Sequence, residues 1–401
     1  MMLRTLFLLF VLSVFARAQS LDEIITYTLD NHNSLRAIEQ KLSSFDETLS
    51  LTQKFQNPEL SLSMGDIQFK DVTNRSIEPM QYQSINLKQK IPYFGKRDAA
   101  YSNVLANKEI VFASLQEAKV ALVKEIKLSA YTIWEYEQKL LLVDESMELV
   151  KKNIELSNIY VSNAGEGWHM EMSSIELEHS ELKIKKHSLQ SELRQLYARL
   201  SYLSAMEVTS LDVSVSMKEP LSLESYLQEL PNNKTYLKKA AQIEEKNSFA
   251  KVKELDANID PFVSIGYFQR ESFEDYVSVS VGAALPVYGS ESLNAQKARK
   301  EVLEATSVRE DFSESLKAAI IQEYAKLTNA YEIYKIITNE SLVEIEHMLE
   351  LADASVKNGQ TLVLYTKLLQ KRVALHEKQR VAEASFQRAQ TNLEALRGEI
   401  Q

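Results

Sequence analysis

The chain has 401 residues, a formal net charge of −10 and no cysteine, so neither a disulfide nor a lipid on an N-terminal cysteine can hold it. The acidic balance argues against nucleic acid as a partner and provides no basic patch for anionic lipid. Only nine glycines and seven prolines occur, in clusters, which favours long rods joined at a few corners over globular domains.

Residues 1–18 have the pattern of a signal peptide. Arg4 supplies the positive charge, residues 6–15 form the apolar core, and Ala16-Arg17-Ala18 is a cleavage site of the small-x-small type. The apolar run is shorter than the roughly 20 residues that a membrane-spanning helix requires. The sequence therefore predicts an exported chain whose mature form begins at Gln19.

The first structural repeat is expected over residues 19–212. Apolar residues recur at helical spacing from Leu21 to Gln56, which predicts one amphipathic helix that Asn57-Pro58 ends. The spacing then changes from about 3.6 to about 2 residues, which predicts a β-hairpin over 58–92. Beyond it, apolar residues about 3.5 positions apart are typical of a coiled coil and predict a helical hairpin over 96–206.

The second repeat, residues 213–401, has the same order of elements. Its first helix contains Pro231, an interruption that the first copy is expected to lack. A second β-hairpin is predicted over 261–286 and a second helical hairpin over 290–397. Each long arm would be roughly 100 Å in length at 1.5 Å per residue. The predicted fold class is mainly α with a small β part, built from a duplicated unit of helix, two strands and a long helical hairpin.

Four strands in one chain cannot close a barrel, and an open sheet leaves two unpaired edges. In hydrocarbon each unpaired backbone group costs several kcal/mol, so lipid-facing strands must close with strands of other copies. The apolar alternation fits lipid-facing strands, and it also fits a soluble hairpin with one buried face. The signal peptide and the two long rods favour an outer-membrane barrel with a long periplasmic extension.

These features together resemble the outer-membrane efflux (TolC-like) family over essentially the whole mature chain. The segment from Gln89 to Arg97 is similar to a proline-to-glycine-lysine-arginine turn of its heavy-metal (Czc/Cus-type) branch. The first helical tip resembles the pattern of that branch, a glycine, an acidic residue and then a hydrophobic residue followed by Glu, at Tyr160, Gly165, Glu171 and Ile175-Glu176. The resemblance implies a homotrimer with a 12-stranded outer-membrane β-barrel continuous with an α-helical periplasmic tunnel.

The function that the resemblance implies is the passive exit duct of a tripartite efflux pump, which works with a periplasmic adaptor (membrane fusion) protein and an inner-membrane pump. Metal cations and small toxic compounds are both open as substrates, because the chain lacks the lipidated cysteine frequent in the metal branch. The alternatives are a type I secretion duct and a periplasmic coiled-coil interaction protein of the adaptor kind.

Two groups of residues are candidates for functional roles. The second tip lacks the aspartates that form acidic rings in well-known family members, so Glu171 is the candidate gate charge, whose removal should loosen closure. Lys96 and Arg97 are expected to contact lipid headgroups, as a surface anchor at the junction of barrel and tunnel, or else to solubilise the first turn. The tip-turn and gate candidates are Gly165, Gly167, Glu171, Gly359 and Thr361. The junction candidates are Pro92, Gly95, Lys96, Arg97, Pro286 and Gly289.

Catalytic chemistry is not expected. Glu176 with His179 and Glu344 with His347 have the Glu-x-x-His spacing of helical di-iron sites, but glutamate is common on every solvated face of this chain, so a structural role is favoured. The segment His169-Met170-Glu171-Met172 offers ligand types for copper or silver, and tip packing is again the favoured interpretation. No nucleophile with a paired base, phosphate loop or zinc spacing occurs. We therefore expect no enzyme, cofactor or bound metal, and outer-membrane lipid rather than nucleic acid as a partner.

Overall fold

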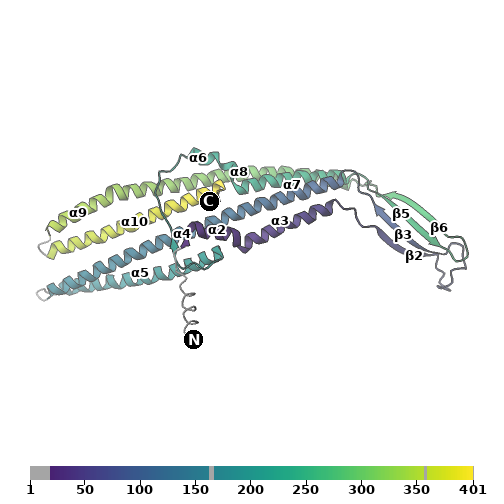
Figure 1. The fold of residues 1–401 in the computed structure, drawn as a ribbon. Helices are drawn as coiled ribbons and strands as arrows, with labels where there is room; N and C mark the ends of the chain where they lie inside the picture. Colours follow the sequence, from purple (N-terminus) through teal and green to yellow (C-terminus); the bar gives the residue numbers. More distant parts are fainter. Residues whose placement is uncertain (1–18, 162–166, 356–358, 401) are drawn as a thin grey trace, which may run out of the picture. The chain divides into compact units, whose positions relative to one another are not determined.

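The structure is a computed structural model that describes residues 19–161, 167–355 and 359–400. The predicted signal peptide lies outside the described residues. The described chain consists of helices, one four-stranded sheet and a short two-stranded sheet. The order of helix, two longer strands and long helical hairpin occurs twice (Figure 1). The predicted fold class is confirmed at the level of the single chain.

The chain divides into two compact units, and each predicted repeat contributes to both of them. Unit 1 comprises residues 1–37, 116–234 and 313–401, as far as these are described. Unit 2 comprises residues 38–115 and 235–312, and it contains the sheet. The boundary between the repeats at residues 212 and 213 stays a prediction.

The first helical segment is broken, so the prediction of one helix from Leu21 to Gln56 is wrong. Helix α2 (Leu21–Asn31) begins with a capping box, in which Ser20 and Glu23 each accept a hydrogen bond of 3.2 Å from the other's backbone N–H. At His32 the backbone leaves helical geometry (ψ 124°), and α3 (Asn33–Thr52) follows. Both copies of this segment are therefore interrupted.

In the second copy the interruption at Pro231 is confirmed. Proline lacks an N–H and is tolerated in the first turn of a helix, which is where it lies in the short 3₁₀ turn η1 (Leu230–Asn232). Helix α6 (Leu223–Gln228) precedes this turn and α7 (Lys234–Asp256) follows it.

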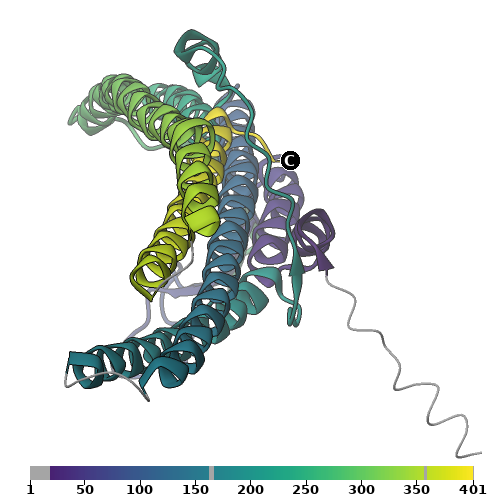
Figure 2. The same cartoon turned by 90° about the vertical axis from the view of Figure 1, so that its left-hand side faces the viewer.

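The long helices form two antiparallel hairpins, which Figure 2 shows from the end of their tips. Their residues 116–204 and 313–397, as far as these are described, belong to unit 1. In the second hairpin a π-helical turn interrupts the first arm, which the sequence did not predict. No helix among the described residues is both long and apolar enough to cross a membrane. The elements are α4 (Lys96–Val161), α5 (Gly167–Ser204), α8 (Ser290–Ile336), η2 (Ile337–Ser341), α9 (Leu342–Ser355) and α10 (Gly359–Arg397).

Apolar side chains close each hairpin along its length, as the coiled-coil spacing predicted. One cluster joins α2, α4 and α5 around Ile24, Ile126 and Leu200, which are fully buried. A second cluster joins α9 and α10 around Ile345 and Leu368. A short parallel pair, β1 (Gln19–Ser20) and β4 (Leu211–Asp212), fixes the start of α2 beside the segment that follows α5.

The four longer strands form one antiparallel sheet in the order β2-β3-β5-β6 (Figure 1). The two β-hairpins, β2-β3 and β5-β6, are thus joined through β3 and β5. This leaves β2 and β6 as the edges of the sheet, each without a second partner strand among the described residues. The strands are β2 (Glu59–Gly65), β3 (Tyr82–Lys90), β5 (Pro261–Gln269) and β6 (Tyr276–Ala283).

Candidate functional site

One face of the sheet is apolar and uncovered. The register aligns Leu60, Leu87, Ile265 and Val279 in one row across all four strands, and paired residues of an antiparallel sheet point to the same side. Val279 is 65 % exposed, although it lies in the middle of its strand. The large apolar residues exposed on this face are Leu60, Leu62, Met64, Ile85, Leu87, Ile265, Tyr267, Val277, Val279 and Val281.

The opposite face is polar and made largely of small residues. A row of Ser61, Asn86, Gly266 and Ser278 crosses the sheet there. The hydroxyl oxygens of Ser63 and Ser84 lie 2.8 Å apart, and the Asn86 side chain donates to Ser84 at 3.0 Å. A sheet with one apolar and one hydrogen-bonding face is suited to a boundary between hydrocarbon and water.

Glycines on the polar face make room for aromatic rings. The ring of Tyr82 lies over Gly65 on the neighbouring strand, and the ring of Phe262 lies over Gly282. Any Cβ at these glycines would collide with the ring, which explains the close approach that glycine within a strand indicates. Phe268 stacks on Tyr276 with ring centroids 4.8 Å apart, so aromatic side chains cover the end of this face near the loops.

Three charged side chains lie together on the polar face, at the end of the sheet near the helices. The Glu59 carboxylate on β2 lies between Lys88 and Lys90 of β3, at 3.4 Å and 3.3 Å from their ammonium nitrogens. The Lys88 ammonium group also lies 4.6 Å from the centre of the Phe262 ring. We call Glu59, Lys88 and Lys90 the lysine belt.

The junction between strand and helix uses two glycines in left-handed geometry. Gly95 has φ +85° and Gly289 has φ +72°, which other residues adopt only with strain. These glycines end the two related segments that begin at Pro92 and Pro286. Helices α4 and α8 begin directly after them.

Lys96 joins the two repeats within unit 2. Its ammonium group binds Asp260 at 2.8 Å and the Asn258 carbonyl oxygen at 2.9 Å. Asp260 also accepts a 2.7 Å hydrogen bond from the backbone N–H of Tyr93. One carboxylate of the second repeat thus holds both the turn and the first helical residue of the first repeat.

Arg97 lies against the end of the first helical segment. Its guanidinium group donates to the Gln53 carbonyl oxygen at 3.1 Å and lies 4.2 Å from the centre of the Phe55 ring. Both basic residues of the junction therefore have partners within the chain. The expected contact of these two residues with lipid headgroups stays a prediction.

An ionic network links α4 and α10 in unit 1. The Glu135 side chain is only 7 % exposed, and it accepts bonds from Arg388 at 2.5 Å and from Lys139 at 2.6 Å. Further along the same helices Lys127 binds Glu394 at 2.9 Å. Burial, with Glu394 nearby, raises the pKa of Tyr131 to about 12, so this phenol stays neutral. The network fixes one hairpin against the other.

The predicted tip residues are placed only in part. Gly165 lies outside the described residues, while Gly167 is the first residue of α5 and Gly359 the first residue of α10. Glu171 and Thr361 lie within these helices. Near this end, the Thr366 side chain donates to Asn153 at 3.0 Å, which connects α10 with α4.

Apolar stripes remain uncovered on the outer helices of unit 1. On α5, Met170, Leu177 and Ile184 are exposed at intervals of seven residues, and Leu177 is 62 % exposed. Ile336 and Val343 are also exposed on the α8–α9 arm, but they flank η2 and so do not share one side of it, and of these residues only those on α5 follow a seven-residue interval. Apolar residues at this interval are typical of a coiled-coil surface that packs against another helix.

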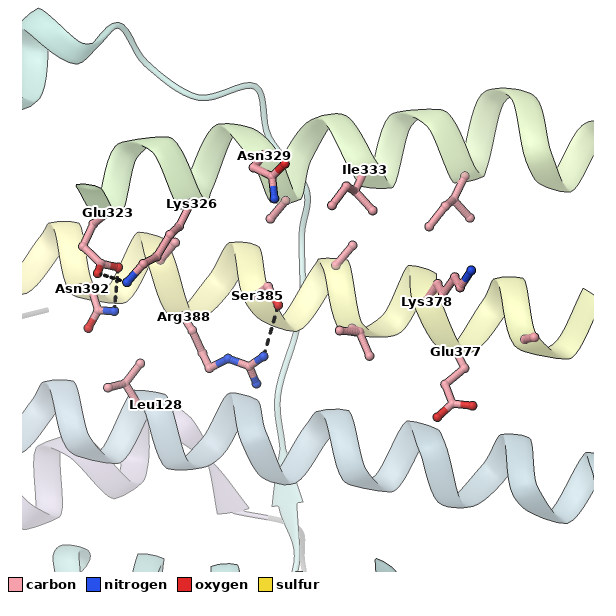
Figure 3. A pocket seen from close by; sticks show the side chains of 16 residues that line it. Leu128, Glu323, Lys326, Asn329, Ile333, Glu377, Lys378, Ser385, Arg388 and Asn392 are labelled. Carbon is pink, nitrogen blue, oxygen red and sulfur yellow. Dashed lines mark hydrogen bonds and ion pairs between the residues drawn. The ribbon is translucent and has the colours of Figure 1, made fainter. Parts of the chain in front are cut away.

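A groove of about 970 Å³ lies between α8 and α10 beside Leu128 of α4 (Figure 3). Its apolar lining includes Ile333 and several alanines. At its rim, Glu323 accepts hydrogen bonds from Lys326 at 2.6 Å and from Asn392 at 2.9 Å. The groove is therefore apolar, and these three polar side chains at its rim bind one another.

Among the residues that the structure describes, no group of three or more His, Asp or Glu side chains is placed to hold a metal ion. The two Glu-x-x-His pairs fall on α5 and α9. The segment His169–Met172 lies in the first turns of α5.

No family model matches the chain, and no curated protein matches it by sequence. Solved structures do match over nearly its full length. CusC, studied for the conformational changes of folding and transmembrane channel formation, has 13 % sequence identity and a TM-score of 0.76, covering 94 % of this chain and 92 % of CusC. The open outer-membrane channel MtrE of Neisseria gonorrhoeae has 12 % identity and a TM-score of 0.76, with 94 % and 89 % covered.

The CmeC outer-membrane channel of Campylobacter jejuni has 14 % identity and a TM-score of 0.71, covering 94 % of this chain and 85 % of CmeC. The chain therefore has the fold of outer-membrane channels. The TolC-like resemblance seen in the sequence is confirmed at the level of the fold, and a Cus-type channel is among the matching structures.

Proposed function

We propose that this protein is the outer-membrane exit duct of a tripartite efflux pump, a passive homotrimeric channel that carries out no chemistry of its own. The sheet would contribute to a barrel in the outer membrane, and the helices to a tunnel in the periplasm. A periplasmic adaptor and an inner-membrane pump would deliver the substrate. Metal cations and small toxic compounds are the substrate classes to test.

The observation that carries the proposal is the two-faced sheet with two open edges. Burial of apolar surface contributes about 25 cal/mol per Å², and ten large apolar side chains on one face remain exposed in the described chain. Lipid would cover this face. The unpaired backbone groups of β2 and β6 would then have to pair with each other between copies, because lipid offers no hydrogen bonds.

Three copies would bring twelve strands together, the number that the TolC-like resemblance implies. The exposed stripe on α5 and the exposed apolar residues of the α8–α9 arm support the same arrangement, because the two surfaces differ and a head-to-tail contact between them can close a ring. The same neighbouring copies would thus pair with the edge strands of the sheet and cover the exposed apolar surfaces of the helices.

Leu177→Glu is expected to weaken the assembly of the helices. The change places a charge in a surface meant to be buried and removes a contact of about 2 kcal/mol per copy. Sedimentation of the detergent-extracted protein should show a smaller fraction of trimer. Glu176→Lys, which alters the charge of an exposed neighbour off the stripe, should leave the trimer intact; equal loss in both variants would contradict this assignment.

The duct itself is tested by extraction and reconstitution. We expect the protein to require detergent for release, to migrate as a heat-modifiable oligomer, and to conduct ions in planar bilayers. Glu171→Ala should raise the single-channel conductance in these recordings if Glu171 closes the tip, and an unchanged conductance and closed-state lifetime would refute that role. Release by osmotic shock without detergent would support the adaptor-like alternative instead.

A further inference from the structure

The lysine belt gives the polar face of the sheet an excess of positive charge. Two ammonium groups share the single carboxylate of Glu59, so one positive charge per chain is left without a counter-charge in the belt. Lys90 is 50 % exposed, so its charge is accessible from the polar side of the sheet.

This excess contrasts with the rest of the protein. The full chain carries a formal charge of −10, yet the other described strand residues of this face are serine, asparagine, glycine, phenylalanine and tyrosine. The belt therefore sets the sign of the charge along this face of the strands. The lysines are also held in place, because the Glu59 bridges and the Phe262 ring limit their freedom.

We propose that the lysine belt is an anion-preferring filter on the inner wall of the duct, so that anionic solutes pass the barrel more readily than cations of similar size. The proposal rests on the proposed function, because it requires the polar face to line the lumen. If lipid covers the apolar face, the polar face lies on the other side of the same sheet and borders water.

Three copies would place three excess positive charges at one level of the barrel, which makes a ring. Rings of lysine or arginine favour anions in pores, because the fixed charge raises the local concentration of the opposite ion. The effect acts over about 10 Å at 0.1 M salt and about 3 Å at 1 M salt, so selectivity should fall as salt rises.

Reversal potentials of the full-length trimer in planar bilayers under a potassium chloride gradient test the filter. Lys88→Gln with Lys90→Gln should lower the ratio of chloride to potassium permeability roughly two- to threefold at low salt. Glu59→Gln should shift the ratio in the opposite direction, because it removes the only carboxylate of the belt. Lys88→Arg with Lys90→Arg keeps the charge and should retain the wild-type ratio.

The outcomes separate the filter from the duct. A conducting trimer whose reversal potential is the same in the wild type, the glutamine pair and Glu59→Gln would overturn the filter and leave the duct intact. A wild-type protein that forms no channel would contradict the duct. If the glutamine pair fails to assemble, the direction of the shift in Glu59→Gln decides, since a shift towards potassium or no shift refutes the filter.

Discussion

Val279→Arg is expected to abolish assembly of the protein in the outer membrane. Val279 lies in the middle of β6 on the exposed apolar face, and arginine at the centre of a bilayer on the lipid face of a barrel costs about 2–4 kcal/mol. The cost would recur in each copy of a trimer. The measurement is the amount of heat-modifiable oligomer in outer-membrane fractions, which should fall to a small part of the wild-type level.

Ser280→Arg is the matched control. Ser280 follows Val279 directly and pairs with Ser264 on the polar face, so its side chain points to the opposite side of the sheet. This variant should insert and assemble at wild-type levels, because its charge would meet water in the lumen. If the Ser280→Arg variant formed little oligomer and the Val279→Arg variant formed wild-type amounts, the polar face rather than the apolar face would be the one that contacts lipid.

Arg388→Met is expected to lower the stability of the helical region more than the loss of an exposed ion pair would. The variant removes one of two partners of the buried Glu135 carboxylate. Breaking a buried pair from one side costs about 3–5 kcal/mol, and we expect about 2–3 kcal/mol because Lys139 retains its bond. Thermal unfolding followed by helical circular dichroism should show a midpoint several degrees lower.

Two further variants identify the cause of this effect. Lys317→Met removes an exposed bond to Glu314 at 3.3 Å and should change the midpoint little. Adding Glu135→Leu to Arg388→Met removes the buried charge as well and should recover part of the loss, since apolar replacement of a whole pair is frequently near neutral. A double variant no more stable than Arg388→Met would show that packing rather than charge is responsible.

The element order could be predicted because each element has a distinct periodicity in the sequence. The change from helical spacing to alternation located both strand pairs, and the coiled-coil spacing of apolar residues located the long arms. Local pattern carries no information on which hairpins pair, so the contact between β3 and β5 is known only from the structure. The break at His32 was missed because no proline or glycine marks it.

The chemistry of the junction was predicted only in outline. The sequence indicated Gly95 and Gly289 as junction residues, but not that Asp260 of the second repeat holds the turn before Lys96. The lysine belt was missed as well, although the alternation places Lys88 and Lys90 on one side of β3 with the serines. The missing information was the register that brings Glu59 between them.

The π-helical turn η2 explains how the arm formed by α8 and α9 keeps the same side buried before and after the turn. Buried residues leading into it are seven apart, as Ala330 is from Ile337, the first residue of η2, but the next step, from Ile337 to Ile345, is eight. A turn closed by i→i+5 bonds holds one residue more than an α-helical turn, so the surplus residue is absorbed locally. A single-codon insertion at this point would otherwise rotate every downstream contact by about 100°. The rod therefore accommodates the surplus residue and still presents the same side to α10.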